Sequence, residues 1–249
     1  MVTIKSDREI ALMKEAGRIV ALAFEEIEKN IKPGVSTLFL DKIAYDVITK
    51  NNAIPSFKGY GGFPGTICAS VNEVVVHGIP SANQILKNGD IVSIDIGACY
   101  KGYHGDSART FSVGNISDQD QLLLDVTKNA LFEGLKQVKP NNTINDISHA
   151  IEEYVKPYGF GIVEDFTGHG LGRNLHEDPA IPNYGYTPNP VVLKKGMTLA
   201  IEPMINLGSK RVRILRDNWT TITIDKKKSA HFEHSVVVTE DGYEILTKI

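Results

Sequence analysis

The chain has 249 residues with 27 basic and 30 acidic side chains, a net charge of −3, and 42% hydrophobic residues. These values are ordinary for a soluble globular protein whose core is large enough to fold without disulfide staples. They exclude a strongly basic surface, so DNA is not an expected partner. The only two cysteines, Cys68 and Cys99, form no disulfide framework, and no apolar run near the N-terminus is long enough for a signal sequence or a membrane span. We therefore expect a cytoplasmic protein that makes no membrane contact.

The first part of the chain predicts two helices followed by a hairpin. Residues 6–9 have the form of a capping box, and apolar residues then recur at steps of three and four, which predicts a long amphipathic helix. The segment 32–34, Lys-Pro-Gly, should end this helix, and a shorter helix should follow Ser36. Residues 91–99 and 103–113 are rich in β-branched residues and predict two β-strands joined by a short turn.

The second part of the chain repeats this plan. A helix through residues 126–138 should end at Lys139-Pro140, and another helix should follow Thr143. Three further segments predict strands: 198–205, 219–224 and 231–238.

A fixed offset of 107 residues relates the two parts. Lys32-Pro33 and Lys139-Pro140 differ by 107 positions (139 − 32), and so do the strand segments that reach Asp95 and Glu202 (202 − 95). The helix segments 23–31 and 130–138 keep the same offset. One offset kept over three separated blocks favours an internal duplication over a chance likeness of two ordinary helix-loop-helix-strand units. Two copies are too few for a solenoid. We therefore expect a single domain, 1–249, with pseudo-symmetric halves of about 1–113 and 114–249.

Asp95 and Asp106 are the first candidates for chemistry. Period-2 alternation places Asp95 on the strand face of two small residues, Ser93 and Gly97, which leave space around its carboxylate. With the turn centred on Tyr100-Lys101, a regular hairpin would place Asp95 and Asp106 directly opposite each other. Like charges in such a pair are destabilising. A shared proton, a nearby Lys or Arg, or a bound cation would each relieve the repulsion.

Further acidic and imidazole side chains favour the cation. Glu202 takes the place of the first carboxylate in the second half, and Glu233 is centred in a strand too apolar to carry a carboxylate without a role. His169 and His176 lie in a glycine-rich segment that we expect to be a loop. Taken alone, the two histidines could be surface residues and the glycines could form an anion-binding nest.

Together these side chains form a set of four carboxylates and one imidazole, namely Asp95, Asp106, Glu202, Glu233 and His169. Four carboxylates exceed what one divalent ion usually needs, so two ions bridged by shared carboxylates are the economical arrangement. Oxygen-rich ligation with one imidazole suits Mn, Fe, Co or Zn, and the lack of a CxxC motif argues against a structural zinc site.

Seven ordered blocks of the sequence cover nearly the whole chain, at residues 72–80, 89–95, 104–106, 168–172, 176–177, 201–203 and 232–234. This set resembles the motif set of the type I methionine aminopeptidases. The resemblance implies a pita-bread fold of the α+β class, in which two pseudo-symmetric halves share a curved antiparallel sheet covered by helices. It also implies that Asp95 and Asp106 hold one metal ion, and that Asp106, His169, Glu202 and Glu233 hold the other. Asp106 and Glu233 would bridge the two ions.

The same resemblance implies a metallo-exopeptidase that releases the initiator methionine from nascent polypeptides and prefers a small second residue. A metal-bridging water would attack the first peptide bond. Glu202 would shuttle the proton, His176 would bind the scissile carbonyl oxygen, and His77 would contact the scissile amide nitrogen. The short spacing from His176 to Glu202 excludes the insertion of type II enzymes, and we expect no N-terminal extension.

The methionine side chain needs an apolar pocket, and four residues align with the family pocket: Tyr60, Phe63, Cys68 and Trp219. Leu175, next to His176, is a fifth expected substrate-binding residue. Without the resemblance, these residues would be interpreted as a core cluster beside a flexible loop. Leu175 stands where many members have an aromatic residue, and Phe57 fills a position often held by a smaller one. The resemblance therefore leaves the size of the pocket open.

Two alternatives to this function are a peptide-binding module that kept the fold and lost catalysis, and an aminopeptidase of another specificity. The first would not need the intact set of presumed ligands and histidines. The second, including a proline-directed peptidase, would use the same metal centre. Separately, the segment 225–228, Asp-Lys-Lys-Lys, predicts a solvated turn, with contact to the anionic ribosome as a second interpretation. We expect a monomer.

Overall fold

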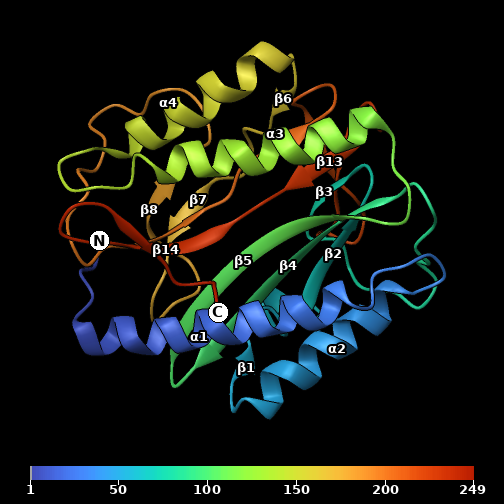
Figure 1. Ribbon diagram of the computed structural model, residues 1–249, viewed down its shortest axis with the longest axis horizontal. Coiled ribbons are helices and arrows are strands. Elements are labelled where there is room, and N and C mark those ends of the chain that lie inside the picture. Colours follow the sequence, from blue (N-terminus) through green and yellow to red (C-terminus); the bar gives the residue numbers. More distant parts are fainter. Residues whose placement is uncertain (1) are drawn as a thin grey trace.

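A computed structural model describes residues 2–249 of the chain (Figure 1). The helices are α1 (Asp7–Glu28), α2 (Thr37–Lys50), α3 (Asp118–Leu135) and α4 (Ile144–Val155), with 3-10 turns η1 (Tyr60–Gly62) and η2 (Lys156–Tyr158). The strands of the first half are β1 (Ile54–Pro55), β2 (Ile67–Val71), β3 (Val74–Val76), β4 (Ile91–Tyr100) and β5 (Tyr103–Ser112). Those of the second half are β6 (Gly161–Ile162), β7 (Gly168–Gly170), β8 (Glu177–Ile181), β9 (Thr198–Ile201), β10 (Met204–Asn206), β11 (Val212–Ile214), β12 (Thr221–Thr223), β13 (Ser229–His231), β14 (His234–Val238) and β15 (Tyr243–Ile245). None of the helices within residues 2–249 has both the length and the apolar content needed to cross a bilayer.

Three of the four α-helices begin at the predicted signals, whereas α3 begins at Asp118, eight residues (126 − 118) before the predicted segment 126–138. Ser6 and Glu9 form the predicted capping box at α1, and Thr143 forms another with Asp146 at α4. The Ser36 side chain accepts a hydrogen bond from the backbone N–H of Phe39 and so caps α2. Each cap satisfies N–H groups that a helix leaves without an internal partner, which explains why these polar residues mark the helix starts.

The offset of 107 residues recurs in the structure. It relates the ends of α1 and α3, the starts of α2 and α4, and the starts of β4 and β9. It extends to the loops, because the isolated bridge Ser36↔Ile85 in the first half matches Thr143↔Val192 in the second. In Figure 1, α1 and α2 lie on one side of the strands, and α3 and α4 lie on the other. These equivalences support the predicted pair of halves.

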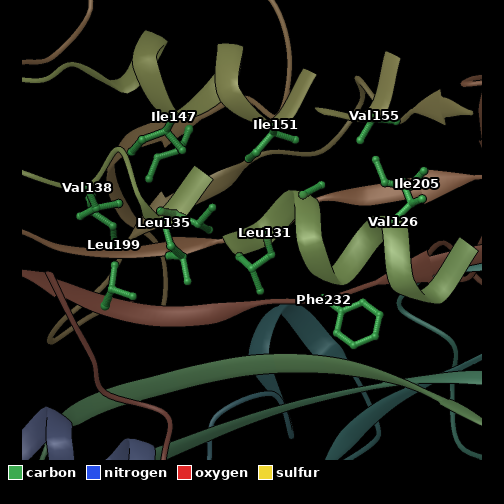
Figure 2. Packing of buried hydrophobic residues seen from close by; sticks show 14 of the residues in the cluster. Val126, Leu131, Leu135, Val138, Ile147, Ile151, Val155, Leu199, Ile205 and Phe232 are labelled. Atoms are coloured by element: carbon green, nitrogen blue, oxygen red, sulfur yellow. The ribbon is translucent and has the colours of Figure 1, made fainter. Parts of the chain in front are cut away.

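Each half packs its helices on its own strands around a separate core. In the first half, α1, α2, β2 and β4 contribute the core, including Phe24 and Ile94. In the second half, α3 lies between α4 and the strands, as Figure 2 shows for Leu131, Ile151 and Leu199. The apolar stripes predicted from the helical spacing are therefore the buried faces, and their burial is the main stabilising term of each half.

The β4–β5 hairpin has a different register from the predicted one. Tyr100 pairs with Tyr103, so the turn is Lys101-Gly102, whose φ values are +48° and +81°. A two-residue turn with two positive φ values matches the right-handed twist of the strands, and glycine favours it. Asp95 therefore faces Ala108, and Asp106 faces Gly97. The prediction that the two carboxylates lie directly opposite was wrong by two residues; they lie diagonally on the same face.

Two predicted strands of the second half are broken. The segment 198–205 divides into β9 and β10 at Glu202-Pro203, and the segment 231–238 divides into β13 and β14 at Phe232-Glu233. Pro203 has no N–H for a ladder, which accounts for the first break. The strands before and after each break belong to different sheets, because β9 and β14 lie in the five-stranded order β15-β14-β9-β7-β8, whereas β10 and β13 lie with β6. Both breaks place a glutamate at a junction between sheets.

Hydroxyl side chains join the two halves across β5 and β13–β14. The backbone N–H of Asp106 donates to Ser235 Oγ at 3.0 Å, and Ser107 Oγ donates to the backbone carbonyl of Glu233 at 2.6 Å. The backbone N–H of Glu233 donates to the carbonyl of Ala108 at 2.9 Å. These bonds hold Asp106 of the first half beside Glu233 of the second.

The basic turn after β12 is only partly solvated. Residues 225–227 are exposed, as predicted. Lys228 is not, because its ammonium group donates to Asp120 Oδ2 at 2.8 Å and to the carbonyl of Gly89 at 2.7 Å. Lys228 thus connects the turn to the start of α3.

Candidate active site

The twelve predicted site residues all line one cavity of about 210 Å³: Tyr60, Phe63, Cys68, His77, Asp95, Asp106, His169, Leu175, His176, Glu202, Trp219 and Glu233. They come from both halves of the chain and from segments separated by up to 173 positions (233 − 60). The fold brings them together because the β4–β5 hairpin, the end of β3, strand β7 and the two broken strands all reach this cavity.

Four carboxylates meet at the bottom of the cavity with too few hydrogen-bond donors. Among the described residues, Asp95 Oδ1, Asp106 Oδ1 and Glu233 Oε1 are buried without a hydrogen-bond partner. Burial raises the pKa of Asp106 to about 7. Burial and the neighbouring carboxylates also raise the pKa values of Asp95, Glu202 and Glu233 well above their usual range. Four such groups cannot all ionise near pH 7 unless a positive charge joins them.

His169 lies in a strand, which corrects the prediction of a loop. Strand β7 runs between β8 and β9, and its two glycines serve strand packing, because a Cβ on Gly168 would lie 2.4 Å from the carbonyl oxygen of Ala200. The Nδ1 atom of His169 lies 2.8 Å from the carbonyl oxygen of Gly170 and can donate to it. This leaves the Nε2 lone pair free, 3.5 Å from Glu202 Oε1 and 4.0 Å from Asp106 Oδ2. Burial also lowers the pKa of His169 to about 4, so the ring is neutral and can bind a metal.

This donor set fits divalent cations. Two groups of three donor atoms each lie within 4.8 Å of one another: Asp106, His169 and Glu233 form the first, and Glu202, His231 and Glu233 form the second. Glu233 belongs to both groups, whereas Asp106, the other predicted bridging residue, belongs to the first group alone. Asp95 belongs to neither, but the neighbouring Asp106 carboxylate contributes to the raised pKa of Asp95 after burial. Carboxylate oxygens with one or two imidazoles are the ligands that Mn, Fe, Co and Zn accept.

Two more histidines stand above the carboxylates. His77 directly follows β3 with a φ of +58°, an uncommon conformation for a residue other than glycine. Its ring contacts Phe166 and Trp219 edge to face, and burial lowers its pKa to about 4. His176 lies in the loop between β7 and β8, and its Nδ1 is 2.8 Å from the Tyr60 hydroxyl. Burial lowers the pKa of His176 as well, so both rings are neutral near pH 7.

An apolar pocket adjoins the carboxylates. Phe57, Phe63, Cys68 and Leu175 form one buried cluster, against which Trp219 packs edge to face on Phe63 with 5.2 Å between ring centroids. Cys68 pairs with Asp95 across β2 and β4, so the pocket lies directly beside the acidic residues. Burial raises the pKa of the Cys68 thiol, which therefore acts as an apolar wall. Tyr60 remains 47% exposed and lies at the mouth.

Some lining residues were absent from the predicted site: Val76, Phe166, Thr167, Met204 and His231. Phe57 was noted only as a departure from the family pattern. His231 had a detectable signal, because it lies two residues before Glu233, and alternation in a strand places such residues on one face. Phe166 and Met204 had none, since only the tertiary fold brings them to the cavity.

The chain was compared with known families, curated proteins and solved structures. The family model described as metallopeptidase family M24 matches residues 11–240. Methionine aminopeptidase 1 of Bacillus subtilis is 57% identical over 249 residues, which is all of this chain and all of the relative. Methionine aminopeptidase of Clostridium acetobutylicum is 49% identical, with 99% of both chains covered.

The fold is also similar to that of a solved methionine aminopeptidase. The crystal structure of methionine aminopeptidase from Thermotoga maritima superposes with a TM-score of 0.98 at 47% identity, and the match covers 100% of both chains. This confirms the predicted pita-bread fold of the α+β class. The chain therefore belongs to metallopeptidase family M24, among the methionine aminopeptidases.

Proposed function

We propose that this chain removes the N-terminal methionine from newly made polypeptides, with two divalent metal ions bound by Asp95, Asp106, His169, Glu202 and Glu233. One observation carries the proposal. Four carboxylates with raised pKa values and three unpartnered oxygens lie beside an apolar pocket suited to an uncharged, flexible side chain. A binding module without catalysis would have no use for such a concentration of buried acid, whose repulsion destabilises the fold.

When bound, divalent ions lower the pKa of a water molecule enough for it to act as a nucleophile near neutral pH. Glu202 lies at the junction of β9 and β10. Its carboxylate oxygens lie 3.5 Å from Nε2 of His169 and 3.4 Å from Nε2 of His231. Glu202 accepts a proton from the attacking water and delivers it to the amide nitrogen of the leaving peptide. Burial and the Asp106 carboxylate raise the pKa of the Glu202 carboxyl well above its usual range, which makes Glu202 a stronger proton acceptor than an exposed glutamate.

His176 and His77 act on the scissile amide. If the Tyr60 hydroxyl donates to Nδ1 of His176, the ring proton lies on Nε2, which then donates to the carbonyl oxygen as negative charge develops there. His77 is held by two aromatic rings and contacts the amide nitrogen. Both rings are neutral, so each can donate one hydrogen bond without adding a net charge to the site.

The pocket selects the first residue of the substrate. Phe63, Cys68, Leu175 and Trp219 bury the methionine side chain, and Tyr60 closes the mouth. The α-amino group of the substrate lies toward the carboxylates, which accounts for the restriction to the first peptide bond. The next residue of the substrate would lie near His77 and His176, and the resemblance to the type I methionine aminopeptidases leads us to expect a preference for a small second residue there.

The decisive experiment measures free methionine released from Met-Ala-Ser by metal-stripped protein titrated with Mn, Co, Fe or Zn. We expect metal-dependent release that falls about 10²- to 10⁴-fold in Glu202→Ala and in Glu202→Gln, the range for loss of general acid–base catalysis. Circular dichroism confirms that each variant is folded. No release with any of the four metals, from folded protein that binds them, would contradict the proposal.

A peptide panel separates this function from related ones. Met-Ala should be cleaved faster than Met-Lys, and Xaa-Pro peptides should not be cleaved. Faster cleavage of the Xaa-Pro peptides would instead favour a proline-directed peptidase that uses the same centre.

We further propose that the protein acts as a cytoplasmic monomer and contacts the ribosome through the exposed Lys226 and Lys227. These two ammonium groups can approach the anionic ribosomal surface, whereas Lys228 is engaged with Asp120. Pelleting with ribosomes at low salt tests this contact. The double variant Lys226→Glu/Lys227→Glu should lose it, and unchanged pelleting would contradict it.

A further inference from the structure

His231 is a buried imidazole in the site to which the proposed reaction assigns no role. Its side chain, on β13, is 2% exposed and lines the cavity. Its Nε2 atom lies 3.4 Å from Glu202 Oε2 and has no hydrogen-bond partner among the described residues. A buried polar atom without a partner costs free energy, so its retention calls for an explanation.

The two oxygens of Glu202 face different imidazoles. Oε1 lies 3.5 Å from Nε2 of His169, and Oε2 lies 3.4 Å from Nε2 of His231. His169 is a proposed metal ligand, so Oε1 is on the metal side of the carboxylate. Oε2 is the oxygen on the His231 side, and a carboxylate that serves both as ligand and as proton acceptor needs both oxygens held in place.

The backbone of His231 is fixed from both sides. Its N–H donates to Thr110 Oγ1 at 2.9 Å, and the same hydroxyl donates to its carbonyl at 2.8 Å. On the other side, His231 pairs with Met204 of β10, two residues after Glu202. The backbone of His231 is therefore held between β5, in the first half of the chain, and β10, and this fixes the position from which its imidazole faces Glu202.

We propose that His231 is a positioning residue whose Nε2–H donates to Oε2 of Glu202 and fixes the orientation of that carboxylate. This rests on the proposed function, in which Glu202 moves the proton. Hydrogen bonds of catalytic groups are often long before substrate binds and shorten afterwards, which accords with a separation of 3.4 Å. Without the donor, Glu202 could rotate, and both its metal binding and its proton transfer would suffer.

The test compares His231→Leu, which removes the donor, with His231→Gln, whose side-chain amide can place a donor at a similar distance. Isothermal titration of metal-stripped protein with Mn²⁺ gives the metal affinity, and Met-Ala-Ser hydrolysis at saturating Mn²⁺ gives kcat and KM. We expect His231→Leu to lose about 10- to 100-fold in Mn²⁺ affinity, the usual effect of losing a group that orients a ligand. We expect kcat to fall about tenfold with KM unchanged, and His231→Gln to recover both to within about threefold.

The exposed His149 on α4 provides the matched control, since His149→Leu should change neither quantity. If His231→Leu does not fold, His231→Asn replaces it, because its shorter amide cannot reach Oε2. Wild-type values in the Leu or Asn variant would overturn the inference. So would a Gln variant as impaired as the Leu variant, because the imidazole would then itself bind metal. The Mn²⁺ titration needs no peptide, so it tests the His231–Glu202 pair even if wild-type protein releases no methionine.

Discussion

The two halves of the chain supply their carboxylates in different ways, although they share one plan. In the first half, Asp95 and Asp106 lie within two unbroken ten-residue strands, β4 and β5. In the second half, the equivalent chain is interrupted, and Glu202 and Glu233 lie in the breaks between β9 and β10 and between β13 and β14. The histidines that face Glu202, His169 and His231, also belong to the second half.

This difference separates two tasks. A continuous hairpin holds two short carboxylates rigidly, which suits metal anchoring. A strand that breaks at the functional residue can turn a longer glutamate toward the reacting atoms, at some cost in ladder hydrogen bonds. We infer that the two carboxylates of the first half only hold metal ions, whereas those of the second half hold metal ions and also include Glu202, which moves the proton. Changes in each half should therefore have different signatures.

Removing an anchor should have the largest effect. Asp106→Asn keeps the shape of the side chain but removes the negative charge shared by the two proposed ions. Metal-ion catalysis is worth several kcal/mol, so we expect turnover of Met-Ala-Ser to fall about 10³-fold or more. Metal stoichiometry, measured by elemental analysis after dialysis, should fall with it. Full stoichiometry in a folded Asp106→Asn protein would contradict the anchoring role.

Removing a second-half group that holds no metal should spare the ions. His176→Ala deletes the proposed donor to the carbonyl oxygen, and loss of one such donor costs about 10²- to 10³-fold in kcat. Mn²⁺ affinity should stay within a few-fold of wild type, because His176 lies outside the ligand set. Titration calorimetry and steady-state kinetics on the same preparation give both numbers. A large fall in Mn²⁺ affinity would instead place His176 in the ligand set.

The pH dependence of the free energy of unfolding should report the negative charge of the carboxylates that the proposed metal ions neutralise. The pKa of Asp106 in the folded chain is raised from 3.8 to about 7, so the folded state binds more protons than the unfolded state in that range. Chelated protein should therefore lose stability as pH rises from about 4 through 7, by up to about 1.4 kcal/mol per pH unit for each such group.

Metal binds the deprotonated ligands, so its stabilising effect should grow over the same range. We expect the gap in Tm between Mn²⁺-loaded and chelated protein to widen from pH 5 to pH 8. The gap should be smaller in Asp106→Asn. A Tm difference that narrows with rising pH in the wild type would contradict the proposal that ionisable carboxylates bind the metal ions.

The rigidity of the hairpin can be tested without touching the cavity. A Cβ on Gly105 of β5 would lie 2.6 Å from the backbone nitrogen of Gly17 in α1. Backbone cannot yield as a side chain can, so Gly105→Ala should destabilise the fold by about 1–3 kcal/mol in urea unfolding. Gly242→Ala, where a Cβ would meet no atom within 4 Å, is the matched control. Equal stability of the two variants would show that β5 can move away from α1.

Much of this arrangement could be predicted from the sequence, because the signals are local. Ser6, Ser36 and Thr143 mark helix starts through capping, and period-2 alternation gives the face of Asp95. The offset of 107 then relates Asp95 to Glu202 without any knowledge of the fold. The resemblance to the type I methionine aminopeptidases supplied His77 and the pocket residues.

What could not be predicted depends on neighbours that are distant in the sequence. Gly168 and Gly170 suggested a loop around His169, but they are strand residues whose adjacent strands approach too closely for a side chain. Pro203 is a local signal against a single strand over 198–205, because proline has no N–H for a ladder. The break at Glu233 has no comparable local signal. The turn at Lys101-Gly102 was misplaced by one residue, which shifted the carboxylate pairing by two.

The smallest expected effect lies where the two halves meet above the cavity. Tyr60 belongs to the first half, and its hydroxyl is 2.8 Å from Nδ1 of His176 in the second. Tyr60→Phe keeps the ring at the pocket mouth and removes only this hydrogen bond, which is worth about 0.5–1.5 kcal/mol. We expect kcat to fall about 3- to 10-fold, because His176 would no longer hold its proton on Nε2 in a fixed orientation. KM should change little, because the apolar contacts of the pocket remain. A raised KM with unchanged kcat would instead make Tyr60 a wall of the pocket alone, and steady-state kinetics with Met-Ala-Ser separates the two roles.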